Sequence, residues 1–413
     1  MSDVVSGFIP PLQTAQTQWP IDFTETLPPE LWGMVIDLVL DEIRNPYLYC
    51  SPKTFSQLQM RLFHTENLER DSILDDWKRV RSVCRTWRRL AGPCPHFLIK
   101  ETLPRKFQIR EKPSSIFIGG SPKQKAIMER LIQDPSIGHK LTTLAFGLVL
   151  IHQTGAVDLL LDQSSIFPNL RCLAFADAAS QQPFWRGIQD GFPKLVSLTV
   201  RRHRQSFGGL YTLDNLQLLD VEAWRGFQLS CPSLKHLCIS GGSSLATEEF
   251  LHSHSHQLES FLSDSFSPSL SSCENSLQFW SAFPNLELLG MRAGLSRLQE
   301  PPAGHPLRYI QLSSFFESPR PDEVLPEIEP FRGITRLYLM PPIPGSRVGT
   351  LTVDDLRDTC LARGIEIVKL PRVKQRATSA KRFYWILDVA ICLTCPCWFP
   401  FLLCFPPKGC RPM

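Results

Sequence analysis

A six-residue pattern, Leu-x-x-Leu-x-apolar, recurs through the chain from residue 141 onwards. Its first positions are 18 to 29 residues apart, and a degenerate copy lies at Leu258. The alternating apolar residues in each copy predict a short strand with one apolar face. One strand cannot bury that face alone, so the copies are expected to stack into a continuous core. The clear copies begin at Leu141, Leu170, Leu195, Leu216, Leu234, Leu286, Leu307 and Ile334.

The spacing of these copies is similar to that of leucine-rich repeats, whose period is about 20 to 29 residues. Several copies follow an aromatic residue or Cys and then Pro, as at Phe167-Pro168 and Phe283-Pro284. Asn is missing from the usual turn position, which predicts an irregular α/β solenoid with a concave parallel sheet over residues 141–370. The alternative is a doubly wound α/β domain, but most spacings are too short for its strand-helix units.

The residues between the inward leucines should point outward on the concave sheet. Mixed polar and aromatic groups on a curved wall suit an unknown protein target better than a buried small molecule. The expected exposed stripe includes Ser197, Thr199, Asp220 and Gln311. The predicted target-binding residues are Arg201, Glu222, His236, Arg292, Tyr309, Arg336 and Tyr338.

A basic run, Arg201-Arg202-His203-Arg204, lies at the end of one predicted strand. Clustered guanidinium groups can pair with a phosphorylated or acidic recognition segment. The alternative is an ordinary solvated loop.

Two helices are predicted nearer the N-terminus. The first begins at Leu27-Pro28-Pro29-Glu30-Leu31, where prolines and an acidic residue suit a first helical turn, and ends at Asn45-Pro46. The second contains Val83-Cys84-Arg85-Thr86-Trp87-Arg88-Arg89-Leu90 and ends at Gly92-Pro93. Its apolar residues share one face, whereas the opposite face is rich in arginine. The alternative is an ordinary amphipathic helix pair.

These two segments together resemble the F-box, a helical module that docks proteins onto the Skp adaptor of cullin-RING ubiquitin ligases. The module would cover residues 27–92, with an insertion at about 44–74 that costs little as a surface loop. The resemblance implies Skp-type adaptor and cullin partners, and a role in selecting proteins for ubiquitin-dependent degradation. It assigns adaptor contacts to Leu27, Pro28, Glu30, Leu31, Ile36, Val80, Val83, Cys84 and Trp87.

The remaining segments are a flexible leader at 1–26, a linker at 93–140 and a tail at 371–413. The 44 basic and 40 acidic residues give a net charge of only +4, which does not favour a nucleic-acid partner. The 13 cysteines show no framework spacing, and no secretory signal opens the sequence. We therefore expect an intracellular protein, in the cytoplasm or nucleus.

The tail begins with basic residues and continues as an apolar stretch over 383–405 whose charged residue is Asp388. A basic flank beside apolar sequence favours attachment to an anionic membrane leaflet. Acylation would reinforce it at Cys392, Cys395, Cys397 or Cys404. A membrane-spanning helix, a zinc or redox site at the Cys392/Cys395 pair, and a disordered or packed tail are the alternatives.

Little in the sequence predicts catalysis, a metal site or a cofactor. His252, His254 and His256 alternate, but no carboxylate or Cys with ligand spacing completes a metal site, so a polar loop is expected there. Nucleophile elbows, phosphate-binding glycine loops and His-Glu-x-x-His motifs are missing. We therefore predict a non-enzymatic substrate adaptor, with a non-ligase interaction scaffold, tethered to a membrane by its tail, as the alternative.

Overall fold

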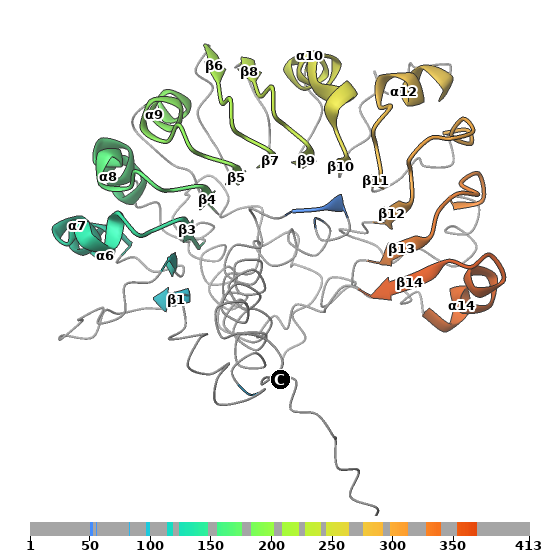
Figure 1. Ribbon diagram of the computed structural model, residues 1–413, viewed down its shortest axis with the longest axis horizontal. Helices are drawn as coiled ribbons and strands as arrows, with labels where there is room; N and C mark the ends of the chain where they lie inside the picture. The colour runs from blue at the N-terminus through green and yellow to red at the C-terminus, as the bar shows by residue number, and fades with distance from the viewer. Residues whose placement is uncertain are drawn as a thin grey trace, which may run out of the picture.

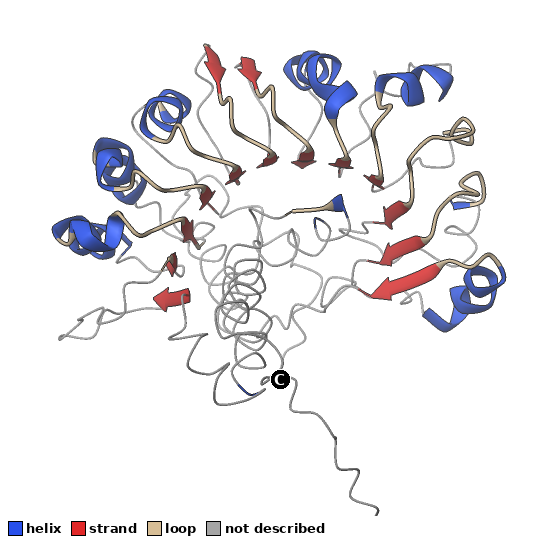
Figure 2. Cartoon of the chain, viewed as in Figure 1, coloured by secondary structure: helices blue, strands red, loops and turns tan. Residues whose placement is uncertain are grey.

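A computed structural model describes the solenoid and a few residues ahead of it. The described residues are 50–52, 55, 82, 96–99, 114–118, 124–147, 155–175, 183–201, 209–222, 228–240, 245–263, 276–291, 298–312, 328–339 and 353–369. They form an arc with strands along its inner side and short helices around its outer rim (Figures 1 and 2). This α/β arrangement is consistent with a solenoid like that of leucine-rich repeats.

The inner layer is one sheet. Within the described part of the chain it has twelve strands, all pairing in parallel, and they follow sequence order apart from β6 and β8, which lie elsewhere. A doubly wound sheet would reverse its strand order, so that alternative is wrong. The strands are β1 (His96–Ile99), β2 (Ser115–Ile118), β3 (Thr143–Phe146), β4 (Cys172–Phe175), β5 (Ser197–Val200), β7 (Leu218–Glu222), β9 (His236–Ser240), β10 (Ser260–Ser263), β11 (Leu288–Met291), β12 (Tyr309–Leu312), β13 (Arg336–Leu339) and β14 (Glu366–Lys369).

The outer layer changes with the length of each repeat. The short steps that end at Leu216 and Leu234 carry the strands β6 (Leu210–Thr212) and β8 (Gln228–Ser230) in their described outer part, and these two strands pair with each other. Longer steps have room for helical turns. The described helices of the outer layer are α6 (Gln124–Gln133), α7 (Pro135–Gly138), α8 (Gly155–Asp162), η2 (Ser164–Ile166), α9 (Phe184–Gly191), α10 (Leu245–His254), η3 (Ser255–Gln257), α12 (Ser276–Ala282) and α14 (Val353–Ala362).

The core lies between the sheet and the outer layer and is built from aligned inward side chains. Parallel register places Leu144 beside Leu173, and Leu173 beside Leu198. The same alignment continues to β14, where Leu337 pairs with Ile367. All the clear sequence copies fall on strands as predicted, and the degenerate copy at Leu258 leads into β10.

A turn before several strands explains the Phe-Pro motif. In these repeats the amide of the first leucine donates to the carbonyl three residues earlier, as from Leu170 to Phe167 (3.2 Å) and from Leu195 to Phe192 (3.1 Å). Proline after the aromatic residue presets the backbone angle that such a turn needs. The aromatic side chains of these turns, Phe167, Phe192 and Phe283, are buried and fill the core beneath the outer layer.

Hydrogen bonds also join successive repeats where each strand begins. Two consecutive amides donate to one carbonyl of the preceding repeat, as Arg171 and Cys172 do to Thr142 (2.8 and 2.9 Å). Asparagine side chains add further bonds between repeats. The Asn169 side-chain amide donates to the His139 carbonyl and that of Asn285 to the His256 carbonyl, both at 2.8 Å. The repeats thus do use asparagine, although one residue before the first leucine.

The sheet begins earlier than the sequence pattern predicts. β1, β2, α6 and α7 all lie within residues 93–140, which we expected to be a linker. β2 was missed because isoleucines, Ile116 and Ile118, occupy the inward positions there, and a leucine template passes over them. The expected leader, most of the F-box-like segment and the tail at 371–413 lie outside the described residues. Among the helices that are described, none is both long and apolar enough to cross a bilayer.

Replacing an inward leucine should destabilise the whole stack. Leu237 is fully buried, so Leu237→Ala should lower the free energy of unfolding by about 2 to 5 kcal/mol through cavity formation. Leu361→Ala on α14 is the matched control, because Leu361 is 66% exposed and should change stability by less than about 0.5 kcal/mol. Urea unfolding followed by circular dichroism measures both, and equal losses would contradict this account of the core.

Candidate functional site

The concave face of the sheet has two halves of different character. On β2 to β5 its residues are mostly small, including Thr143, Ala145, Cys172, Ala174 and Ser197. From β7 to β14 most of the same register positions carry larger groups, although Cys238, Ser260 and Gly290 are small. The larger residues, in chain order, are Leu218, Asp220, His236, Leu262, Leu288, Tyr309, Gln311, Arg336, Tyr338, Glu366 and Val368. The face therefore offers a shallow region beside a filled one.

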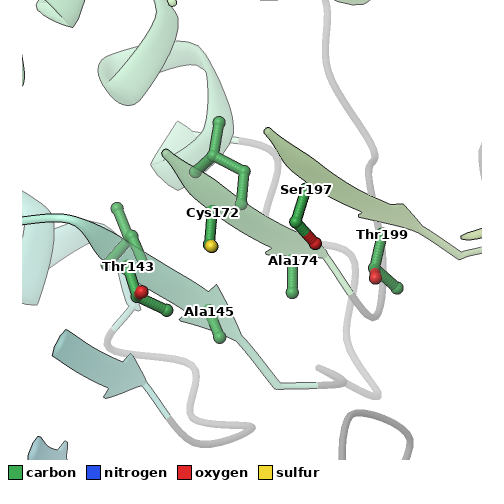
Figure 3. Close-up of a pocket in the computed structure, with 8 residues that line it drawn as sticks. Thr143, Ala145, Cys172, Ala174, Ser197 and Thr199 are labelled. Atoms are coloured by element: carbon green, nitrogen blue, oxygen red, sulfur yellow. The ribbon is translucent and has the colours of Figure 1, made fainter. Parts of the chain in front are cut away.

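The small half contains a shallow, solvent-open hollow whose cavity volume is about 10 Å³ (Figure 3). Six labelled side chains line it from neighbouring strands, among them Cys172 and Thr199. The Thr199 hydroxyl is buried and, within the part of the chain that is described, has no hydrogen-bond partner. Burial raises the pKa of the Cys172 thiol to about 12, so this cysteine is not a thiolate nucleophile at neutral pH. The hollow has room for about one water molecule and is therefore not a ligand pocket.

The larger half carries an apolar cluster on the concave side. We call Leu218, Cys238, Leu262, Leu288 and Tyr338 the concave apolar patch. Phe55 packs on this patch and is only 1% exposed, and Cys50 contacts the same cluster. In Figure 1 this segment is the short blue piece on the inner side of the arc. The chain thus places its own residues on the surface that the sequence assigns to a target.

His236 joins this segment to the sheet. Its Nε2 lies 3.2 Å from the Cys50 carbonyl oxygen, which can only accept, so Nε2 carries the proton. Nδ1, 3.0 Å from the Ser260 hydroxyl, then accepts from that group. The imidazole also lies 5.4 Å from the Phe55 ring, centroid to centroid. Both ring nitrogens of His236 are therefore hydrogen-bonded, and the residue is only 1% exposed.

Burial lowers the pKa of His236 to about 4. The negative charge of Glu259 and the hydrogen bond to Cys50 favour the protonated ring, while Lys235 opposes it, but burial has the largest effect. The imidazole is therefore neutral throughout the physiological range. A neutral ring is what the two observed hydrogen bonds require.

A buried ion pair lies beside the patch. The Arg201 guanidinium donates to both carboxylate oxygens of Asp220, at 2.6 and 2.8 Å, and also to the Ser240 hydroxyl. Burial raises the pKa of Asp220, and the positive charge of Arg201 opposes that effect. Arg201 follows β5, Asp220 lies on β7 and Ser240 lies on β9. The two charges are therefore buried and paired with each other.

The structure corrects the expected exposure of the target-binding residues. All of those that are described lie on or beside the concave face, as predicted, but Arg201, His236 and Tyr338 are buried at 8, 1 and 0% exposure. Ser197, Thr199, Asp220 and Gln311 are buried too, so the prediction that they are exposed is wrong. Strand alternation gives the face of a residue, whereas curvature and covering segments decide its burial. Arg292 lies outside the described residues.

Three predicted residues remain half-buried on this face. They are Glu222, Tyr309 and Arg336. Arg336 forms an ion pair with Glu366, with its Nε 2.6 Å from a carboxylate oxygen, and Tyr309 packs edge-on against Tyr338. Tyr309 and Arg336 border the patch, and all three groups keep some accessible surface.

The alternating histidines form a helix end and not a polar loop. His252 and His254 lie on α10 and His256 on η3, so they face different directions. His254 is buried, where its Nδ1 donates to the Phe250 carbonyl and its Nε2 accepts from the Cys231 amide (both 2.9 Å). Within the described ranges, no group of three potential ligands could hold a metal ion.

The other predicted sites are not described. The adaptor-contact residues Leu27 to Ile36 and Val80 to Trp87, and the tail cysteines from Cys392 to Cys404, all lie outside the described residues. Those predictions stay predictions. Sequence reasoning missed Phe55, because neither its spacing nor its neighbours mark it as part of the solenoid.

Comparisons with known proteins leave the family open. The chain matches no protein-family model, and no curated protein is significantly similar to it in sequence. The argument for function therefore depends on the residues themselves.

The buried neutral His236 should make stability depend on pH. In the unfolded chain this group has a pKa near 6.5, so acid protonates the unfolded state first and stability falls from about pH 6.5 down to pH 4. The loss should reach about 3 kcal/mol, since each pH unit of displacement is worth about 1.4 kcal/mol. We expect the unfolding free energy of His236→Gln to lack this fall between pH 6.5 and pH 4. Urea unfolding at pH 7, 5 and 4 measures it.

The control for that experiment is His252→Gln, which changes an exposed imidazole on α10. This variant should keep the pH dependence of the unmodified chain. If His236→Gln instead followed the same pH profile as the control, the buried neutral state of His236 would be refuted.

The Arg201–Asp220 pair should show strong coupling. Arg201→Met leaves a buried carboxylate uncompensated and should cost about 3 to 5 kcal/mol. Adding Asp220→Val removes that charge, so the double variant should be more stable than Arg201→Met alone. Arg186→Met is the control, because its ion pair with Asp190 on α9 is exposed and should contribute less than about 1 kcal/mol. Simple additivity in urea unfolding would argue against the pair.

Proposed function

We propose that this chain is the substrate-recognition subunit of an SCF-type ubiquitin ligase. The observation that carries the proposal is the order of its parts: two helical motifs resembling an F-box precede a solenoid with a long concave face. The motifs would bind a Skp-type adaptor and, through it, a cullin. The solenoid would hold the target protein.

The concave face supports this role because it already binds polypeptide. Phe55 and the Cys50 carbonyl pack against side chains from several strands, as a bound segment of another protein could. The chain needs no chemistry of its own for the proposed role, since the ligase core would transfer ubiquitin to a target held nearby.

The second candidate is an interaction scaffold that uses the same concave face without recruiting a ligase. The basic and apolar tail favours this alternative, because it predicts attachment to a membrane through Cys392, Cys395, Cys397 or Cys404. Recovery of a Skp-type adaptor and a cullin with the full chain distinguishes the two.

The proposal predicts that the F-box-like face carries the adaptor affinity. Trp87→Ala removes a large apolar side chain, and loss of such an anchor costs about 2 to 4 kcal/mol of binding. The Trp87→Ala, Leu31→Ala double variant should therefore lose the adaptor in co-purification. Leu361→Ala, a change on the exposed side of α14, should retain it.

Circular dichroism of the double variant should show the solenoid intact. Full adaptor recovery with this variant would remove the ligase role and leave the scaffold as the better explanation.

A further inference from the structure

Residues of the chain itself lie on the concave apolar patch. Phe55 belongs to the same buried cluster as the patch, and its ring lies 5.4 Å from the His236 imidazole, centroid to centroid. Cys50 lies five residues before Phe55, and its carbonyl accepts a hydrogen bond from His236. Between them, the Phe55 amide donates to the Ser51 carbonyl at 2.8 Å, which forms a single helical turn. Pro52, also buried, lies in that turn.

This contact defines the chemistry that the patch accepts. Its centre is apolar, and the imidazole beside it is neutral and donates one hydrogen bond. Two guanidinium groups described on this face are already paired, Arg201 with Asp220 and Arg336 with Glu366. A phosphorylated segment would find no uncommitted charge in these two arginines. The patch therefore suits an uncharged segment with an aromatic anchor.

We propose that the concave apolar patch is a recognition site for a target-protein segment with a Phe-type side chain five residues after a backbone carbonyl that accepts a hydrogen bond from His236. The segment at Cys50, Ser51, Pro52 and Phe55 is its internal mimic and holds the site until a target displaces it. This inference rests on the proposed function, because it names the kind of target that the concave face would bind.

The geometry allows such exchange. The described contacts of the internal segment with the sheet include the Phe55 ring and one hydrogen bond between neutral groups, and Tyr309 and Arg336 at the border of the patch keep accessible surface. A target can use those border residues as well as the patch. A tethered segment competes at an effective concentration of the order of millimolar, so removing its anchor should expose the site to an added ligand.

The test uses the full chain and a labelled peptide of its own residues 46–58, with Cys50→Ser to prevent oxidation. Fluorescence anisotropy should show the peptide binding the Phe55→Ala chain at least about tenfold more tightly than the unmodified chain. A peptide with Phe55→Ala is the matched control and should bind at least about tenfold more weakly. Equal binding of the two peptides, or no gain in the Phe55→Ala chain, would overturn the proposal.

A second measurement does not depend on how the variant folds. The same peptide with a photoreactive benzoyl-phenylalanine at position 55 is added in excess to the unmodified chain, and mass spectrometry locates the crosslinks. We expect them on β9, β10 and β11, with loss of the signal when unlabelled peptide competes. Crosslinks confined to the outer helices would overturn the proposal.

These outcomes are separate from those of the adaptor experiment. Peptide binding at the patch without adaptor recovery would support the recognition site and refute the ligase role. Adaptor recovery without peptide binding would leave the ligase role in place and refute this site.

Discussion

No repeat of this chain can bury its apolar face alone, so the solenoid depends on the parallel pairing of each strand with the next. Pairing in constant register sets Leu144, Leu173 and Leu198 side by side within the core. The paired amides at the start of each strand hold that register. Because side chains alternate between the two faces, the same constraint also aligns every residue on the concave side.

The concave alignment brings polar side chains close enough to satisfy one another. Arg201 spans to Asp220 and Ser240, and His236 meets Ser260 on the next strand. Buried polar groups are costly unless they are paired, so these contacts satisfy polar side chains of the concave face without a partner protein. What remains for a partner is the concave apolar patch and its half-buried border.

The position of Phe55 in the chain gives that patch a further significance. Phe55 lies between the two motifs that resemble an F-box, within the stretch that separates them. On the proposed function, displacement of this segment by a target would act on the same stretch of chain that joins the adaptor-binding helices. Target binding and adaptor geometry would then be coupled through a covalent connection and not through the sheet.

Much of the fold was predictable, because repeat spacing and alternation are local properties of the chain. The clear copies and the one at Leu258 all lie at strands, and the predicted concave positions face the predicted side. The repeat pattern does not predict the strands at Ser115–Ile118 and His96–Ile99, because the first has isoleucine at the inward positions and the second does not follow the repeat. The roles of Asn169 and Asn285 also needed the structure, since their partners lie in the preceding repeat.

The sequence by itself determined that inward leucines would stack and which residues would share the concave face, because a strand's alternation follows from its backbone. Only the tertiary structure decided that His236 and Tyr338 are buried there and that Phe55 packs beside the His236 imidazole. The hydrogen bond from His236 to Cys50 joins residues 186 positions apart. Periodicity carries no information about such a contact, because it depends on how the whole curved sheet meets a distant segment.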